Sequence, residues 1–201
     1  MQRMKIGIMG GTFNPIHNGH LLLGEMAYEQ FGLDKVLIMP TKHPYYKDIS
    51  GNIMEKDRVA MVQLAVNDNP HFEFSALELN REGTTYTVDT LEELHQKFPE
   101  NDYYFILGKD SLDYLESWKD VTRIFELCKI IAASRDDLDG KIDEKIAYLN
   151  RKYHAEIFRL YSPNLEISSS YLRKELSTGK SCRYLVPDSV LAYIKENRLY
   201  G

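Results

Sequence analysis

Residues 10–20 have the sequence Gly-Gly-Thr-Phe-Asn-Pro-Ile-His-Asn-Gly-His. The apolar run 4–9 in front of them is typical of a short buried strand, and the apolar spacing from Leu21 onward predicts a helix. Two adjacent glycines let the backbone of such a turn approach a ligand closely, and the first turn of a helix offers unpaired N–H groups. This strand–turn–helix unit is therefore a candidate phosphate site.

Two common phosphate motifs do not fit the chain. A dinucleotide fingerprint needs Gly-x-Gly-x-x-Gly, but the nearby glycines lie at 7, 10 and 11. A Walker loop needs Gly-Lys followed by Ser or Thr, and the pair Gly108-Lys109 is followed by Asp110. The segment 10–20 must be interpreted by its own chemistry.

Its two histidines, His17 and His20, suit a phosphate site. Transfer of a nucleotidyl group depends mainly on positioning and on stabilising charge, and an imidazole at a helix start can donate to a phosphate oxygen. The alternatives are two structural histidines or a zinc site, and the second lacks a third ligand at metal spacing. We predict that both histidines contact phosphate.

The composition is typical of a globular α/β protein. The chain has 201 residues, 43% of them hydrophobic and 27% charged, with a net charge of −5. Because no basic stripe is present, we expect no nucleic-acid partner. The distant Cys128 and Cys182 are typical of reduced thiols. No secretory signal or membrane-length apolar run is found, so we expect a cytoplasmic protein with no membrane partner.

Apolar runs alternate with helical periodicity, which predicts βαβ units. Strands are expected at 4–9, 35–39, 72–79, 102–107, 127–133 and 155–161, and helices from 21, at 55–67, 86–98 and 171–176, and from 187. We predict an α/β, Rossmann-like fold, an open and mainly parallel sheet with helices on both faces and a helical C-terminal tail. A single domain would span 1–201, with a nucleotide-binding core at 1–165 and a segment 166–201 that completes the phosphate site.

The candidate functional segments each follow the end of an expected strand. They are 10–20, 40–47, 108–110 and 134–135. Open parallel sheets bind ligands at that edge, which favours one nucleotide crevice.

Two further groups of residues have side chains that suit a nucleotide. Asp110 can accept from ribose hydroxyls and Trp118 can stack on a heterocycle, although a helix cap and core packing are the alternatives. Ser168 and Ser169 stand at a helix start, with Arg173 one turn inside. Together these can hold phosphate, although a serine cap and a surface arginine are also common separately.

Together these segments resemble the bacterial nicotinate-nucleotide adenylyltransferases, which belong to the HxGH nucleotidyltransferase superfamily. The resemblance extends over nearly the whole chain and is carried by 10–20, 85–87, Gly108-x-Asp110 with Trp118, 167–173 and the ending 184–200. It implies transfer of the adenylyl group of ATP to nicotinate mononucleotide, with Mg²⁺ bound mainly through ATP phosphates and water.

The resemblance also implies the roles of individual residues. The expected catalytic residues are His17, His20 and Arg173. ATP would be bound by Gly10, Gly11, Thr12, His17, His20, Gly108, Asp110, Arg135, Ser168, Ser169 and Arg173. Nicotinate mononucleotide would be bound by Lys47, Thr87, Trp118 and Lys119. We expect no metal ligand among the protein side chains, and the sequence leaves open whether the chain forms a homo-oligomer.

One segment departs from the family pattern. Members commonly have Pro-Pro-His followed by Lys or Arg after the second strand, but this chain has Pro44-Tyr45-Tyr46-Lys47. The basic residue is kept and the stiffness of the loop is altered.

Several other functions fit the same motifs. The acceptor could be nicotinamide mononucleotide or phosphopantetheine. The transferred group could also be cytidylyl, as in small cytidylyltransferases. A different class is a nucleotide-binding regulatory protein without turnover. The retention of both histidines and Arg173 argues against it, because a pure binder does not need donors for a transition state. The acceptor phosphate is already an anion, so in-line attack needs no general base and no covalent intermediate.

Overall fold

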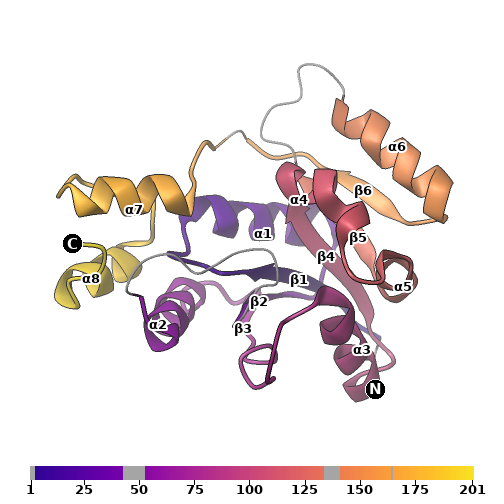
Figure 1. The fold of residues 1–201 in the computed structure, drawn as a ribbon, viewed down its shortest axis with the longest axis horizontal. Coiled ribbons are helices and arrows are strands. Elements are labelled where there is room, and N and C mark those ends of the chain that lie inside the picture. The colour runs from indigo at the N-terminus through magenta and orange to yellow at the C-terminus, as the bar shows by residue number, and fades with distance from the viewer. Residues whose placement is uncertain (1–2, 43–52, 134–140, 164) are drawn as a thin grey trace.

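The computed structural model describes residues 3–42, 53–133, 141–163 and 165–201 (Figure 1). Within these residues, six strands form one sheet. They are β1 (Lys5–Gly11), β2 (Lys35–Pro40), β3 (Phe72–Phe74), β4 (Asp102–Gly108), β5 (Lys129–Ala133) and β6 (Ile157–Leu160). Their order across the sheet is β3-β2-β1-β4-β5-β6, and every adjacent pair is parallel. The α/β fold expected from the sequence is confirmed.

The central strands have apolar sequences because both of their faces are covered. In β2 the residues Val36, Leu37, Ile38 and Met39 are all buried, and in β4 the run from Tyr103 to Leu107 is buried throughout. Continuous apolar runs of this kind are typical of parallel strands between two helical layers.

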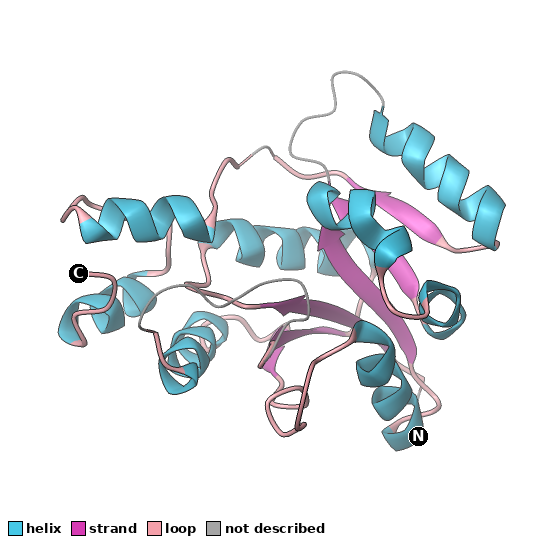
Figure 2. Cartoon of the chain, in the orientation of Figure 1, coloured by secondary structure: helices cyan, strands magenta, loops and turns pink. Residues whose placement is uncertain are grey.

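Helices lie on both sides of the sheet (Figure 2). One face packs against α1 (Asn18–Phe31), α2 (Glu55–Val66), α7 (Ser169–Ser177) and α8 (Asp188–Glu196). The other packs against α3 (Thr87–Lys97), α4 (Lys109–Tyr114), the 3₁₀ turn η1 (Leu115–Ser117), α5 (Val121–Leu127) and α6 (Lys141–Tyr153). The sheet is therefore the middle layer between two hydrophobic clusters.

The order of the strands reverses next to β1. From β1 the chain builds outward through β2 to β3, and it then returns to place β4 on the other side of β1. The loops after β1 and β4 consequently diverge onto opposite faces of the sheet. In open α/β sheets, the crevice at such a switch point is where ligands bind.

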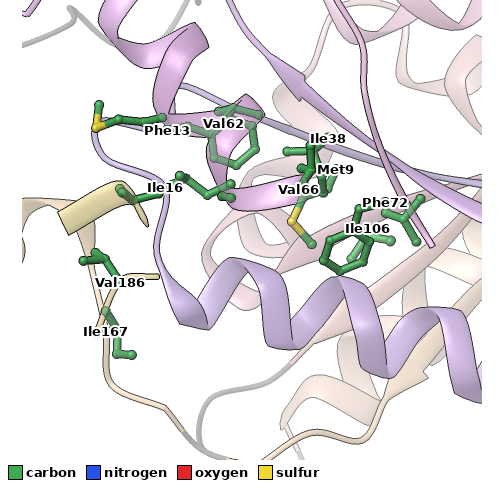
Figure 3. Packing of buried hydrophobic residues seen from close by; sticks show 14 of the residues in the cluster. Met9, Phe13, Ile16, Ile38, Val62, Val66, Phe72, Ile106, Ile167 and Val186 are labelled. Atoms are coloured by element: carbon green, nitrogen blue, oxygen red, sulfur yellow. The ribbon is translucent and has the colours of Figure 1, made fainter. Parts of the chain in front are cut away.

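The C-terminal helices pack beside the loop that joins β1 to α1. In Figure 1, α7 and α8 lie at the left, at the end of the molecule opposite the N-terminus. Figure 3 shows Ile16 of the loop with Ile167 and Val186 of the C-terminal segment nearby, and all three belong to one buried cluster. Residues 166–201 thus form part of the same core as the first strand.

Several helix and strand boundaries expected from the sequence are wrong. The strand expected at 127–133 begins at Lys129, because Leu127 ends α5 and Cys128 alone separates the helix from the strand. The strand expected at 72–79 ends at Phe74. Helix α1 begins three residues earlier than expected, at Asn18, so that His17 is its N-cap residue.

Three helices were not expected. Helices α4 and α5 span six and seven residues, which is too short for a clear periodic pattern. Helix α6 did carry a signal, because Ile142, Ile146 and Leu149 have helical spacing and are buried on one face.

Two other features concern the whole described chain. Both Cys128 and Cys182 are buried and free of disulfide bonds. In the residues that the structure describes, no helix combines the length and the apolar character needed to cross a membrane.

We expect Gly7→Ala to lower the free energy of unfolding by about 1–3 kcal/mol, the usual cost of overpacking a core. A Cβ at this position would lie 2.9 Å from Leu33 Cδ1, 3.1 Å from Val36 Cγ2 and 3.2 Å from Ile106 Cδ1. The matched control is Gly108→Ala, whose Cβ would meet no described heavy atom within 4 Å. Urea unfolding followed by circular dichroism measures both, and equal midpoints would contradict the packing argument.

Candidate functional site

A cavity of about 360 Å³ opens at the carboxyl ends of β1 and β4. Its lining comes from both sides of the switch point. The turn after β1, the start of α1 and the start of α7 contribute on one side, and the end of β4, the start of α3 and Trp118 contribute on the other. The predicted site residues found in this lining are Gly10, Gly11, Thr12, His17, His20, Thr87, Gly108, Asp110, Trp118, Ser168 and Ser169.

The two histidines lie against each other at the start of α1. Their ring centroids are 3.6 Å apart and the ring planes are inclined by 25°. His17 is only 3% exposed. The backbone N–H of His17 donates to Nδ1 of His20 over 3.3 Å, so the neutral ring of His20 carries its proton on Nε2. This tautomer provides a donor on the ring edge away from the backbone.

Gly19 is required by the position of the His17 ring. A Cβ on Gly19 would lie 3.0 Å from Nδ1 and 3.2 Å from Cε1 of that ring. Any other residue would require the imidazole to shift by a few tenths of an ångström. The glycine therefore protects the orientation of the histidine pair.

The predicted anion cradle at α7 is directed partly at the loop before α1. Ser168 caps the helix by accepting from Tyr171 N over 3.2 Å, and Ser169 Oγ donates to Pro15 O over 2.9 Å. Arg173 is not part of the cavity lining in the described residues; its Nη1 donates to Asn14 O over 2.8 Å. Helix α7 thus fixes the loop that carries the histidines.

The other side of the cavity has an open backbone and an aromatic wall. A Cβ on Gly108 would meet no described atom within 4 Å, so packing within the described chain does not require glycine here. Asp110 is exposed in the first turn of α4. The Trp118 ring stands edge-on to Phe105 at 5.8 Å and 87°. A flat ring and a sugar could be held between these groups.

Among the described residues, Lys119 is, like Arg173, not brought to this cavity. The ammonium group of Lys119 lies 3.1 Å from Asp89 Oδ1 and 4.5 Å from the centre of the Tyr86 ring, and Lys119 does not line the cavity. Lys47, with the loop that departs from the family pattern, and Arg135 lie outside the described residues.

The sequence analysis missed Glu78, which lines the cavity and is only 5% exposed. Thr90 Oγ1 donates to its Oε1 over 2.9 Å. Burial raises the pKa of Glu78 above its ordinary value of 4.5, although hydrogen bonds from Thr41 and Thr90 and the charge of Arg81 act in the opposite direction. The sequence did not show this, because the strand was expected to run to residue 79, whereas β3 ends at Phe74 and so leaves Glu78 beyond its carboxyl end.

The comparisons with known proteins agree with this arrangement. The cytidylyltransferase-like family model matches residues 8–175. The chain belongs to the cytidylyltransferase-like family. Within this family, a protein of Lachnoclostridium phytofermentans is 49% identical over 98% of both chains. One of a Synechococcus strain is 42% identical, over 99% of this chain and 96% of its own.

Both cytidylyltransferase-like relatives are named "Probable nicotinate-nucleotide adenylyltransferase", and the resemblance expected from the sequence is confirmed. Among solved structures, Plasmodium falciparum nicotinic acid mononucleotide adenylyltransferase complexed with NaAD superposes with a TM-score of 0.80. The match covers 98% of each chain at 21% identity. The same enzyme complexed with APC gives a TM-score of 0.77 at 20% identity. These two structures support the fold.

We expect the stability of Glu78→Gln relative to the original chain to depend on pH. Because the folded protein raises the pKa of this carboxyl, the original chain is favoured below about pH 4.5 and loses that stability as the pH rises through the folded pKa. Glutamine does not titrate, so the melting temperature of the variant minus that of the original chain should become more positive between pH 4 and about pH 7. Scanning calorimetry across this range measures the difference, and a difference independent of pH would contradict a raised pKa.

Proposed function

We propose that this chain, acting as one nucleotidyltransferase domain over 1–201, transfers the adenylyl group of ATP to nicotinate mononucleotide. The products are nicotinate adenine dinucleotide and pyrophosphate, and the reaction is a step in NAD biosynthesis. The observation that carries the proposal is the stacked pair His17 and His20 at the start of α1, facing a cavity at the switch point of the sheet. Support comes from relatives 49% and 42% identical over nearly the full length that are named for this activity.

The ATP would be held on the side of α1 and α7. The turn Gly10-Gly11-Thr12 brings backbone close to the nucleotide, and the Nε2–H of His20 donates to the phosphates. The hydroxyls of Ser168 and Ser169 lie at the start of α7, and Arg173 adds a positive charge one turn further along. Gly108, Asp110 and Arg135 would contact the adenosine.

The acceptor would be held on the side of Thr87 and Trp118. The indole can stack on the pyridine ring, and the hydroxyl of Thr87 and the backbone N–H of Lys119 suit its carboxylate. Lys47 would meet the acceptor phosphate. The two substrates would then meet across the carboxyl ends of β1 and β4.

The chemistry asks for charge stabilisation and not for proton transfer. One oxygen of the acceptor phosphate forms a bond to the α-phosphorus of ATP as the bond to the pyrophosphate oxygen breaks. The attacking oxygen is already an anion, so no general base is needed. The negative charge that builds on the leaving pyrophosphate would be met by His17, His20 and Arg173.

We extend the proposal to Mg²⁺. Within the described ranges, no group of three or more His, Cys, Asp or Glu side chains could hold a metal ion. Apart from the carboxyls of Glu78 and Asp110, the polar side chains of the cavity lining are mostly imidazoles and hydroxyls, which suits an ion that arrives on ATP with phosphate and water as its ligands. Bound in this way, Mg²⁺ would supply charge neutralisation on the triphosphate.

A pyrophosphate-release assay tests the function. ATP is combined in turn with nicotinate mononucleotide, nicotinamide mononucleotide and phosphopantetheine, and we expect the highest kcat/KM with the first. A product formed faster with either of the other acceptors would replace the proposed acceptor. The absence of product with every acceptor would favour a nucleotide-binding protein without turnover.

We expect His20→Ala to lower kcat by about 10²–10³-fold, as deletion of one charge-stabilising donor usually does. The matched control is His71→Ala, because the His71 ring stacks on Tyr28 at 3.8 Å and does not line the cavity. Steady-state pyrophosphate release measures both variants. A normal kcat in His20→Ala would argue against a phosphate contact.

Trp118→Ala should raise the KM for nicotinate mononucleotide by about tenfold, since stacking of an aromatic side chain on a base contributes about 1–3 kcal/mol. The KM for ATP should change less. Tyr114→Ala serves as the control, because Tyr114 is exposed and does not line the cavity. If only the ATP constant rises, the indole serves the adenosine side or the core.

A further inference from the structure

The turn between β1 and α1 is held by its backbone carbonyls. Arg58 Nη1, from α2, donates to Thr12 O over 2.7 Å. Arg173 Nη1 and Ser169 Oγ, from α7, donate to Asn14 O and Pro15 O. Buried carbonyls need such partners, and here side chains supply them. The position of the turn is therefore set by side chains of α2 and α7, which are far away in the sequence.

Asn14, in this turn, has contacts at both its backbone and its side chain. It is 3% exposed. Its carbonyl accepts from Arg173, and its Oδ1 accepts from the hydroxyl of Tyr200 over 2.7 Å, across 186 positions of sequence. Tyr200 thus reaches the same residue that orients the proposed phosphate-binding arginine.

The backbone at Tyr200 has a left-handed conformation. After α8, Leu199 N donates to Ile194 O over 2.9 Å, and Tyr200 has a φ of 67°. The left-handed region is unfavourable for a bulky side chain, so contacts of the side chain must compensate for it. Burial also raises the pKa of the phenol, which keeps the hydroxyl protonated as a donor.

We infer that Tyr200 is a positioning residue for the triphosphate of ATP, acting through Asn14 on Arg173. The inference rests on the proposed function, because it takes Arg173 as a phosphate contact. The hydroxyl fixes the side chain of Asn14, which fixes the carbonyl that holds one guanidinium nitrogen. The remaining N–H groups of Arg173 then keep one orientation toward the phosphates.

The test is Tyr200→Phe in the full chain, with Tyr193→Phe as the matched control. Tyr193 also donates its hydroxyl to one side-chain oxygen, Asp57 Oδ1, over 2.9 Å. Each variant keeps the ring and loses one hydrogen bond, but only the bond of Tyr200 ends at the turn. ATP binding without acceptor is measured by calorimetry, kcat and both KM values by pyrophosphate release, and folding by the melting temperature.

We expect Tyr200→Phe to raise the Kd for ATP by about tenfold, the effect of losing one buried hydrogen bond, and to lower kcat. The KM for nicotinate mononucleotide should stay within about twofold, and Tyr193→Phe should leave the ATP constants unchanged. In an Arg173→Ala background, Tyr200→Phe should have no further effect on ATP binding, because both changes remove the same contact.

Three results would overturn the inference. They are an unchanged Kd for ATP in Tyr200→Phe, an equal change in Tyr193→Phe, and additive effects of the Arg173 and Tyr200 substitutions. Failure of the proposed function gives a different result, in which the original chain binds ATP and turns over no pyridine mononucleotide. In that case too, the Kd for ATP of Tyr200→Phe, compared with that of the original chain and of Tyr193→Phe, decides the role of Tyr200.

Discussion

The site depends on a buried positive charge that holds the turn between β1 and α1. Arg58 is 1% exposed, and its Nη1 donates to Thr12 O over 2.7 Å and to Thr41 O over 3.0 Å. It thereby ties together the segments that follow β1 and β2. Burial lowers the pKa of Arg58. A cation in this position is costly alone, and a polyanion on the cavity side of the turn would offset that cost.

The two halves of the proposed site are built on opposite faces of the sheet. The proposed triphosphate contacts depend on α1, α2, α7 and α8, which share one hydrophobic cluster. The proposed contacts to the acceptor and to adenosine depend on α3, α4 and η1, which share the other. A packing defect on the first face should therefore affect the triphosphate contacts more than the acceptor contacts. The fold thus separates the recognition of the triphosphate from that of the acceptor.

How much of this structure the sequence predicts depends on how far apart in the sequence the interacting residues lie. The strands around β1 could be predicted because buried parallel strands have apolar runs, and His17 and His20 could be found because their motif is local. The boundary between α5 and β5 near Leu127 could not be predicted, since the end of a buried helix and the start of a buried strand have similar apolar sequences. The roles of Arg58 and Tyr200 depend on partners 46 and 186 positions away, which no local pattern shows.

The contacts that hold the turn between β1 and α1 join residues far apart in the sequence, and this sets the order in which the structure can form. The contacts from Ser169, Arg173 and Tyr200 to the turn span 154, 159 and 186 positions. A nascent chain that has emerged only as far as β6 can pair all six described strands but has none of these three contacts. Binding of nucleotide to a turn that is held by all three contacts therefore stabilises the protein by mass action only late in synthesis.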